Sequence, residues 1–151
     1  MWPKKAIIVP MDTIKRYKDF LDKGKTEREC VNEIVRLAEA KGYKNIESVS
    51  SLKAGDRVYF NQYGKSIALY QIGSEDIEKG MNILGAHIDS PRLDVKMNPL
   101  YESDGIVYLD THYYGGVKKY QWVTIPLAIH GVVVKKDGTS VNIVIGEDDD
   151  D

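Results

Sequence analysis

Two stretches near the start of the chain carry apolar residues at helical spacing. The first runs from residue 12 to residue 23, and its apolar positions are Ile14, Tyr17, Phe20 and Leu21. Asp12 and Thr13 are residue types that cap helices, and Gly24 is a stop signal. We therefore predict a helix over residues 12–23 whose apolar stripe packs into a core.

The second helix has a start signal of its own. Thr26 and Glu29 stand three residues apart, which is the spacing of a capping box, and Gly42 lies beyond the helix end. The pattern predicts an inner stripe made of Ile34, Leu37 and Ala38 and a solvated outer face that carries Glu33, Arg36 and Glu39.

Alternation of apolar and polar residues replaces the helical spacing further along. Residues 57–60 and 66–71 alternate around Gly64-Lys65, which predicts a β-hairpin. Residues 82–88 form an apolar run too short for a surface helix, between Gly80 and Ser90-Pro91. We interpret this run as a buried strand beside the hairpin.

The later part of the chain has strand patterns throughout. Residues 93–96 are extended until Asn98-Pro99 breaks the run, and residues 105–114 form a strand that ends at Gly115-Gly116. Residues 122–134 and 140–145 flank a turn at residues 136–138. Because only hairpin patterns remain after Tyr120, we predict an α/β part at residues 1–118 and a β-rich module at residues 119–151.

His87 and Asp89 are the candidate functional residues at the end of the strand predicted at residues 82–88. Side chains two residues apart in a strand point to the same side, so an imidazole and a carboxylate share one face there. A neutral imidazole is a common zinc ligand, and its second ring nitrogen often donates to a carboxylate. The alternative is that His87 is a hydrogen-bonded residue at a strand end with no metal role.

Composition and charge argue against several other classes of protein. The formal net charge is −2, and no stripe of Lys and Arg with interleaved aromatic residues suggests nucleic-acid binding. The single cysteine, Cys30, cannot form an internal disulfide, and we expect it buried on the second helix. No apolar run reaches the length of a membrane span or a signal sequence. We therefore expect a cytoplasmic protein with no membrane partner.

Two longer motifs, together with a short segment before them, resemble sequences of a known family. Residues 87–96 read His-Ile-Asp-Ser-Pro-Arg-Leu-Asp-Val-Lys, and residues 111–122 read Thr-His-Tyr-Tyr-Gly-Gly-Val-Lys-Lys-Tyr-Gln-Trp. Residues 25–29, Lys-Thr-Glu-Arg-Glu, open the second predicted helix. In this order and spacing, the motifs resemble the aspartyl aminopeptidase family of zinc metallopeptidases, in its bacterial branch, from about Tyr17 to the end.

The resemblance implies a fold and an activity. The fold is a mixed-sheet α/β/α catalytic domain, present in part, with an inserted β-rich lid or dimerisation domain that starts near residue 119. The activity is that of a metal-dependent aminopeptidase that releases N-terminal residues from peptides, with a pair of divalent metal ions, usually zinc, activating a water molecule. The resemblance also implies a homo-oligomer assembled through the lid.

The resemblance assigns roles to two positions in this sequence. His87 matches a metal ligand and Asp89 matches the carboxylate that orients it, while no substrate-binding residue is assigned. The bridging aspartate, the Glu-Glu pair and the distal histidine of such enzymes belong to a later part, and this sequence has no Glu-Glu pair. We therefore expect an N-terminal fragment that is inactive alone and is cut within residues 146–151.

Some alternatives stay open at this stage. Residues 123–126, Val-Thr-Ile-Pro, replace a charged stretch of eukaryotic relatives, which leaves the preference for acidic substrates open. A complete, non-enzymatic α/β binding or assembly module is the rival function. A neighbouring family of co-catalytic zinc aminopeptidases with a similar His-x-Asp strand is a second alternative.

The remaining candidate residues have structural interpretations. We expect His112 to be a packed or hydrogen-bonded strand residue, and no metal role carries over to His130. Asp94 is expected to be exposed or paired with a cation. The tyrosines at positions 113, 114 and 120 are interpreted as packing and hydrogen-bonding residues.

Overall fold

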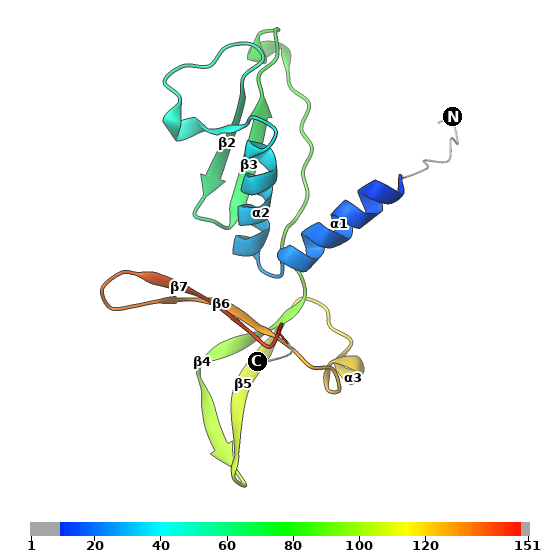
Figure 1. Ribbon diagram of the computed structural model, residues 1–151, viewed down its shortest axis with the longest axis vertical. Coiled ribbons are helices and arrows are strands. Elements are labelled where there is room, and N and C mark those ends of the chain that lie inside the picture. The colour runs from blue at the N-terminus through cyan, green and yellow to red at the C-terminus, as the bar shows by residue number, and fades with distance from the viewer. Residues whose placement is uncertain (1–9, 149–151) are drawn as a thin grey trace. The chain divides into compact units, whose positions relative to one another are not determined.

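The computed structural model describes residues 10–148, and contacts divide the chain into the units Met1–Ile88 and Asp89–Asp151 (Figure 1). The first unit holds α1 (Met11–Lys23), α2 (Glu27–Glu39), β1 (Lys44–Asn45), the 3-10 helix η1 (Ile46–Ser48), β2 (Arg57–Gln62), β3 (Ser66–Gln71) and the 3-10 helix η2 (Ile77–Lys79). The second holds β4 (Arg92–Ser103), β5 (Ile106–Tyr114), α3 (Lys119–Trp122), β6 (Ile129–Val134) and β7 (Ser140–Ile145). The predicted α/β class is confirmed. This division does not test the predicted boundary between residues 118 and 119. The predicted parts, residues 1–118 and 119–151, also include residues outside 10–148.

Helix α1 forms where the spacing predicts it, but its start and its burial differ from expectation. The helix begins at Met11 with Pro10 as N-cap, so Asp12 and Thr13 lie inside the first turn, and the helix ends at Gly24. No residue of α1 is buried, and three of the four stripe residues are exposed: Ile14, Tyr17 and Leu21. The prediction of a packed stripe is wrong here because α1 contacts mainly α2, and the stripe extends beyond that contact.

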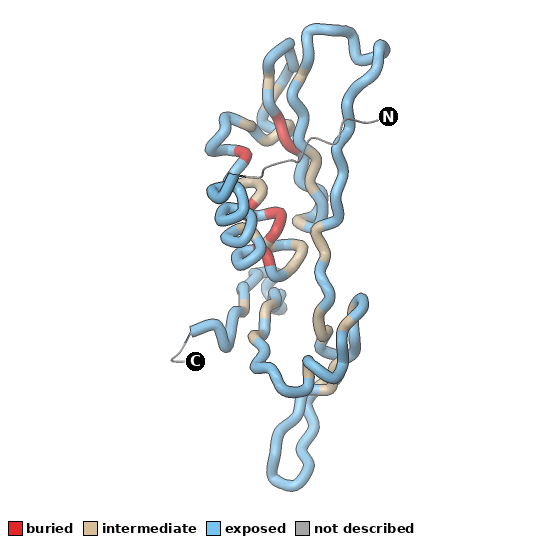
Figure 2. Tube along the Cα trace, turned by 90° about the vertical axis from the view of Figure 1, so that its right-hand side faces the viewer, coloured by how far each residue is buried: buried red, intermediate tan, exposed pale blue. Residues whose placement is uncertain are grey.

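Helix α2 begins with the capping box that the sequence predicts. Thr26 accepts a hydrogen bond from the Glu29 backbone N–H at 3.3 Å, and the Thr26 backbone N–H donates to Glu29 Oε2 at 2.8 Å. Its buried apolar residues are Cys30, Val31 and Ala38, which face a core that includes Val58 and Tyr59 of β2 (Figure 2). Leu37, predicted to lie inside, is 44% exposed, although it lies on the same face as Cys30 two turns further along the helix.

Glu33 is a correction to the predicted outer face of α2. The residue is buried, and Arg36 donates to its carboxylate twice, from Nε at 2.7 Å and from Nη2 at 2.6 Å. Lys23 at the end of α1 places its Nζ 3.7 Å from Glu33 Oε1. The hydrogen bond from Arg36 is the main cause of the lowered pKa of Glu33. This carboxylate is buried because it joins α2 to the last turn of α1.

The sheet of the first unit is mixed and has the order β1-β2-β3. Strand β1 runs parallel to β2, and β2 pairs with β3 in antiparallel register from Arg57↔Gln71 to Gln62↔Ser66. The predicted hairpin is therefore confirmed. Tyr59 of β2 donates its hydroxyl to Glu39 Oε1 at 2.8 Å, which raises the pKa of Tyr59 and ties the sheet to the end of α2.

The buried strand predicted at residues 82–88 is wrong for this structure. No helix or strand is assigned between residues 80 and 91, and the segment is exposed through His87 (Figure 2). Ile83 is 79% exposed and Leu84 is fully exposed. A strand needs hydrogen-bonding neighbours, and no strand within residues 10–148 pairs with this segment. The apolar pattern is present, but the pairing that would bury it is not.

The hairpin of β4 and β5 is the main element of the second unit. Its register runs from Arg92↔Tyr114 at the base to Ser103↔Ile106 at the tip, with a shift between Val95 and Leu100. Asn98-Pro99, predicted to end the strand, instead produces this irregularity within a longer β4, because the pairing resumes at Leu100.

The base of this hairpin is tightly built where β5 ends. Gly115 has a φ of 72°, in the left-handed region that favours glycine. A Cβ placed at Gly115 would lie 3.4 Å from Cα of Pro91 and 3.5 Å from its ring atoms. Of the paired glycines that the sequence marks, Gly115 is the constrained one, because of its positive φ, while a Cβ at Gly116 would meet no atom within 4 Å.

A second hairpin, of β6 and β7, follows the short helix α3. Its register runs from Ile129↔Ile145 to Val134↔Ser140, and its turn lies where residues 136–138 predict it. The strand begins only at Ile129, so the β-like stretch predicted at residues 122–134 is wrong in its first part, where Trp122 ends helix α3 and residues 123–128 form no strand. Within residues 89–148, no residue is fully buried.

We predict that Glu33→Gln lowers the free energy of unfolding of the chain by about 1 kcal/mol at pH 7, because it removes the charge that holds Arg36 and Lys23. Glu47→Gln, which changes an exposed carboxylate in the same unit, is the matched control. Urea denaturation followed by circular dichroism measures the difference. Equal stability of the two variants would show that the Glu33 cluster contributes nothing.

The same cluster predicts a pH dependence. The pKa of Glu33 lies below its ordinary value of 4.5 in the folded chain, so its contribution is complete above that value and is lost as the pH falls through the lowered pKa. The difference in stability between wild type and Glu33→Gln should therefore shrink as the pH falls below 4.5. A constant difference across this range would contradict the assignment.

We predict that Gly115→Ala destabilises the base of the β4–β5 hairpin by about 1–2 kcal/mol, because alanine is strained at this positive φ. Gly116→Ala is the matched control, since a Cβ there meets no atom within 4 Å and its φ is not positive. Amide hydrogen exchange of residues 106–114 reports the local loss. Equal exchange in the two variants would show that the backbone of Gly115 is not constrained.

Candidate functional site

His87 lies in the exposed segment before β4. This segment is not a strand in the structure, so the same-face argument from strand alternation has no strand to support it here. The first unit ends at Ile88 and the second begins at Asp89, so His87 and Asp89 belong to different units. The pairing of their side chains therefore stays a prediction from the motif.

Asp89 is half-buried and is held by a side chain from β5. The hydroxyl of Tyr114 donates to Asp89 Oδ2 at 2.8 Å, across 25 residues of sequence. This contact confirms the interpretation of Tyr114 as a hydrogen-bonding residue. It also identifies the partner of Tyr114 as the carboxylate of the His-x-Asp motif.

Arg92 supports the same tyrosine from the other side of the hairpin base. Its guanidinium carbon lies 3.8 Å from the centroid of the Tyr114 ring, a distance at which a cation is attracted to the ring face. Arg92 Nε also donates to Asp94 Oδ1 at 2.7 Å, so Asp94 is paired with a cation as predicted. Residues 89, 92, 94 and 114 thus form a chain of contacts that we call the Asp89 cluster.

The other two histidines have structural partners. His112 is exposed on β5, with Nδ1 3.5 Å from the backbone oxygen of Asp94. His130 has a side chain only 12% exposed, and its Nε2 lies 3.0 Å from Glu147 Oε1. Cys30 is buried as expected, where its thiol donates to the Gly24 oxygen at 3.3 Å, and burial raises its pKa.

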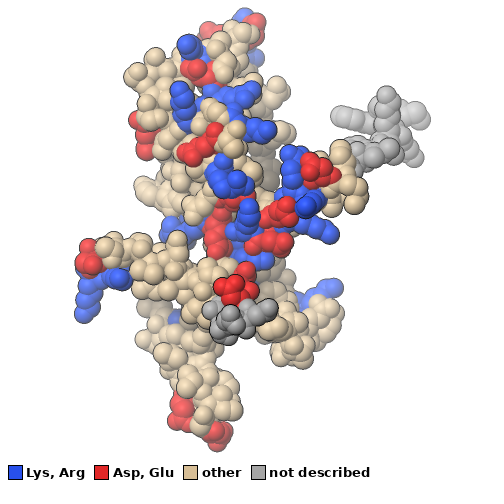
Figure 3. Space-filling model, viewed as in Figure 1, with Lys and Arg blue, Asp and Glu red and all other residues tan. Residues whose placement is uncertain are grey.

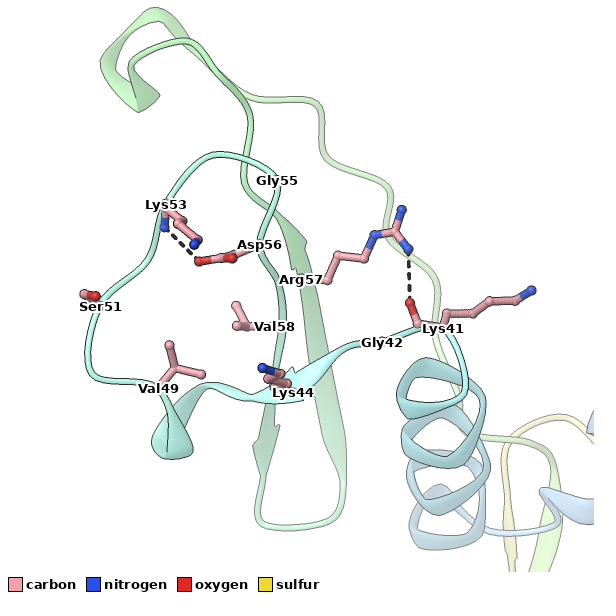
Figure 4. A pocket seen from close by; sticks show the side chains of 10 residues that line it. All are labelled: Lys41, Gly42, Lys44, Val49, Ser51, Lys53, Gly55, Asp56, Arg57 and Val58. Carbon is pink, nitrogen blue, oxygen red and sulfur yellow. Dashed lines mark hydrogen bonds between the residues drawn. The ribbon is translucent and has the colours of Figure 1, made fainter.

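An open cavity of about 590 Å³ lies in the first unit (Figure 4). It is lined by Lys41, Gly42, Lys44, Val49, Ser51, Lys53, Gly55, Asp56, Arg57 and Val58. Two of its polar side chains brace the backbone, because Asp56 accepts from the Lys53 N–H at 2.9 Å and Arg57 donates to the Lys41 oxygen at 3.0 Å. No residue that the sequence singles out as functional lines this cavity.

Surface charge is mixed on the face shown in Figure 3, where acidic and basic side chains lie interspersed over the helices. Short ion pairs account for part of this pattern, for example Arg16–Asp12 at 3.2 Å and Lys25–Asp22 at 3.7 Å. Between residues 10 and 148, no helix has the length and apolar character needed to cross a membrane.

The metal-ligating residues of the described part of the chain are not gathered into one complete site. Within residues 10–148, no group of three or more His, Cys, Asp or Glu side chains could together hold a metal ion. A catalytic zinc ion takes about three protein ligands plus water. The imidazole of His87 and the hydrogen-bonded carboxylate of Asp89 fit one part of such a site, namely a ligand and its orienting group.

Sequence reasoning missed the link from Asp89 to Tyr114 and the support from Arg92. The signal was present in the Tyr-Gly-Gly motif, which places a tyrosine directly before the close passage at Pro91. The register Arg92↔Tyr114, which brings the two motifs together, could not be read from either motif alone.

Comparison with known proteins agrees with this arrangement of motifs. The family model described as "Aminopeptidase I zinc metalloprotease (M18)" matches residues 20–150. A probable M18 family aminopeptidase 1 from Clostridium acetobutylicum is 59% identical over 140 residues, which is 90% of this chain and 30% of that protein. A probable M18 family aminopeptidase 1 from Thermotoga maritima is 46% identical over 137 residues, which is 91% of this chain and 30% of that protein.

The fold agrees with that of a solved relative. The crystal structure of an M18 family aminopeptidase from Thermotoga maritima superposes with a TM-score of 0.87 at 45% identity, covering 93% of this chain and 31% of that one. The chain thus spans about 30% of the length of the relatives that it matches. The match over residues 20–150 includes every motif discussed above, and the chain belongs to the aminopeptidase I (M18) family of zinc metalloproteases.

Proposed function

We propose that this chain is part of a metal-dependent aminopeptidase that releases N-terminal residues from peptides. The observation that carries the proposal is the family match over residues 20–150, which contains both the His-x-Asp and the Tyr-Gly-Gly motifs. The relatives at 59% and 46% identity are both named as M18 family aminopeptidases. The Asp89 cluster supports the proposal from geometry, because a defined hydrogen bond holds the motif carboxylate.

In this proposal His87 is a metal ligand and Asp89 is the catalytic-site carboxylate that orients it. A carboxylate that accepts from the imidazole N–H fixes the tautomer and the ring direction, so that the second nitrogen presents its lone pair to the ion. Zinc bound at such a site polarises the scissile carbonyl and lowers the pKa of a bound water. We propose a pair of zinc ions per site in the complete enzyme, whose remaining ligands would come from outside this sequence.

The remaining expectations also belong to this proposal. We propose that residues 119–151 begin a lid or dimerisation domain through which the enzyme forms a homo-oligomer in the cytoplasm. Exposed apolar residues of the β6–β7 hairpin support this: Val133, Val134, Val144 and Ile145. Such side chains suit a surface that is covered in an assembly.

We predict that residues 1–151 expressed alone bind no stoichiometric zinc and hydrolyse no aminoacyl substrate, because one ligand and its orienting carboxylate do not hold a catalytic ion. Metal analysis after dialysis, together with a panel of aminoacyl substrates, provides the measurement. One bound zinc per chain would contradict the assignment of the remaining ligands to other residues.

We predict that His87→Ala, made in the longest translation product that contains this chain, lowers zinc affinity and kcat by about 100-fold or more. His112→Ala removes an exposed imidazole from β5 and serves as the matched control. Zinc affinity is measured by competition with a chelating dye, and activity against a panel of aminoacyl substrates with and without chelator. If both variants keep wild-type zinc affinity, the proposed function is wrong.

A further inference from the structure

Tyr114 occupies a position that the backbone pairing defines closely. It is the last residue of β5, and its Cα partner across the ladder is Arg92, the first residue of β4. Asp89 lies three residues before Arg92, just outside the strand. The antiparallel ladder therefore brings the Tyr114 side chain back to the segment that carries the motif carboxylate.

The ring of Tyr114 is supported by Arg92, and the residue after it has a restricted backbone. The Arg92 guanidinium stacks on its face at 3.8 Å, and the pair of Arg92 with Asp94 at 2.7 Å restrains that guanidinium in turn. Gly115 follows the tyrosine at a φ of 72°, where any other side chain is strained, and its backbone lies beside Pro91. The hydroxyl that reaches Asp89 is thus attached to a half-buried ring with little freedom to move.

A carboxylate by itself has a soft torsion. Rotation about the Cβ–Cγ bond of aspartate is broad and roughly two-fold, so an unrestrained carboxylate presents its oxygens over a wide range of directions. A hydrogen bond to Oδ2 from a fixed donor restricts this rotation. The hydrogen bond from Tyr114 is thus one restraint on the direction of the second oxygen, Oδ1.

We propose that Tyr114 is a positioning residue for Asp89, and that it acts on the metal site through this carboxylate. This inference rests on the proposed function, in which Asp89 orients the imidazole of His87. Tyr114 contacts neither the metal nor the substrate in this scheme. Its hydroxyl fixes the Asp89 carboxylate, which fixes the imidazole, and the imidazole then binds the ion with less loss of freedom.

The test is Tyr114→Phe in the longest translation product that contains this chain. This change removes one oxygen and keeps the ring under Arg92. We expect zinc affinity and kcat to fall about 10-fold each, with KM within about twofold of wild type, since outer partners of a metal ligand have effects of this size. Tyr113→Phe removes the same atom at the neighbouring strand position, which faces the other side of the hairpin, and should change neither value.

A double-mutant cycle separates positioning from a structural role. In an Asp89→Ala background, Tyr114→Phe should cause no further loss of zinc affinity, because its partner is already absent. A loss of the same size in both backgrounds would show that the hydroxyl acts through the fold and would overturn the inference. Thermal unfolding of each variant shows whether the fold has changed.

The outcome of His87→Ala distinguishes the two proposals. If His87→Ala loses zinc while Tyr114→Phe behaves as wild type, the positioning role is wrong and the proposed function stands. If His87→Ala keeps zinc and activity, the proposed function fails and the positioning role fails with it. If Tyr113→Phe matches Tyr114→Phe in its loss, the effect is not specific to the contact with Asp89, and the positioning role is again wrong.

Discussion

The antiparallel pairing of β4 with β5 is the constraint on which the candidate site depends. Within residues 89–148 no side chain is fully buried, so backbone hydrogen bonds and cross-strand contacts hold this hairpin. Tyr101 and Tyr108 stack with ring centroids 5.1 Å apart, and Lys96 Nζ lies 2.9 Å from Asp110 Oδ2. A lone two-stranded hairpin has marginal stability in water. The hydrogen bond from the Tyr114 hydroxyl to Asp89 therefore depends on the β4–β5 pairing, which brings these two residues together.

The first unit is held differently, by a small core between α2 and β2. Cys30 and Val31 of the helix and Val58 of the strand are almost completely buried, and the Tyr59–Glu39 hydrogen bond closes the edge of this core. Apolar residues outside it remain exposed, including the α1 stripe and the segment around Ile83 and Leu84. Their apolar pattern is typical of buried residues, but no residue within 10–148 covers them. The chain spans about 30% of the length of the relatives that it matches.

Local signals in the sequence predict most of the helices and strands. Burial and long-range strand pairing cannot be predicted from local signals, because they depend on residues far away in the sequence. The capping box at Thr26 and the turns of the hairpins depend on a few neighbouring residues, and the structure confirms them. The strand at residues 82–88 failed because a strand also needs partners, which no local pattern contains. The sequence predicts an exposed Glu33 because glutamate is rarely buried. Its burial is explained by its ion pairs with Lys23 and Arg36. At the candidate site, the His-x-Asp motif identifies Asp89 from the sequence alone. Its contact with Tyr114, 25 residues later, depends on the register of β4 with β5, which the motif does not contain.

The Asp89 cluster also shows how part of a metal site can be organised by short-range structure. The contacts described above lie between residues 89 and 115, within one hairpin and the segments next to it. Contacts close in sequence cost little loop-closure entropy, and a hairpin forms faster than pairings between distant strands. The hydrogen bond from Tyr114 to Asp89 therefore depends on residues that are close in sequence, and the ladder of one hairpin brings its two ends together.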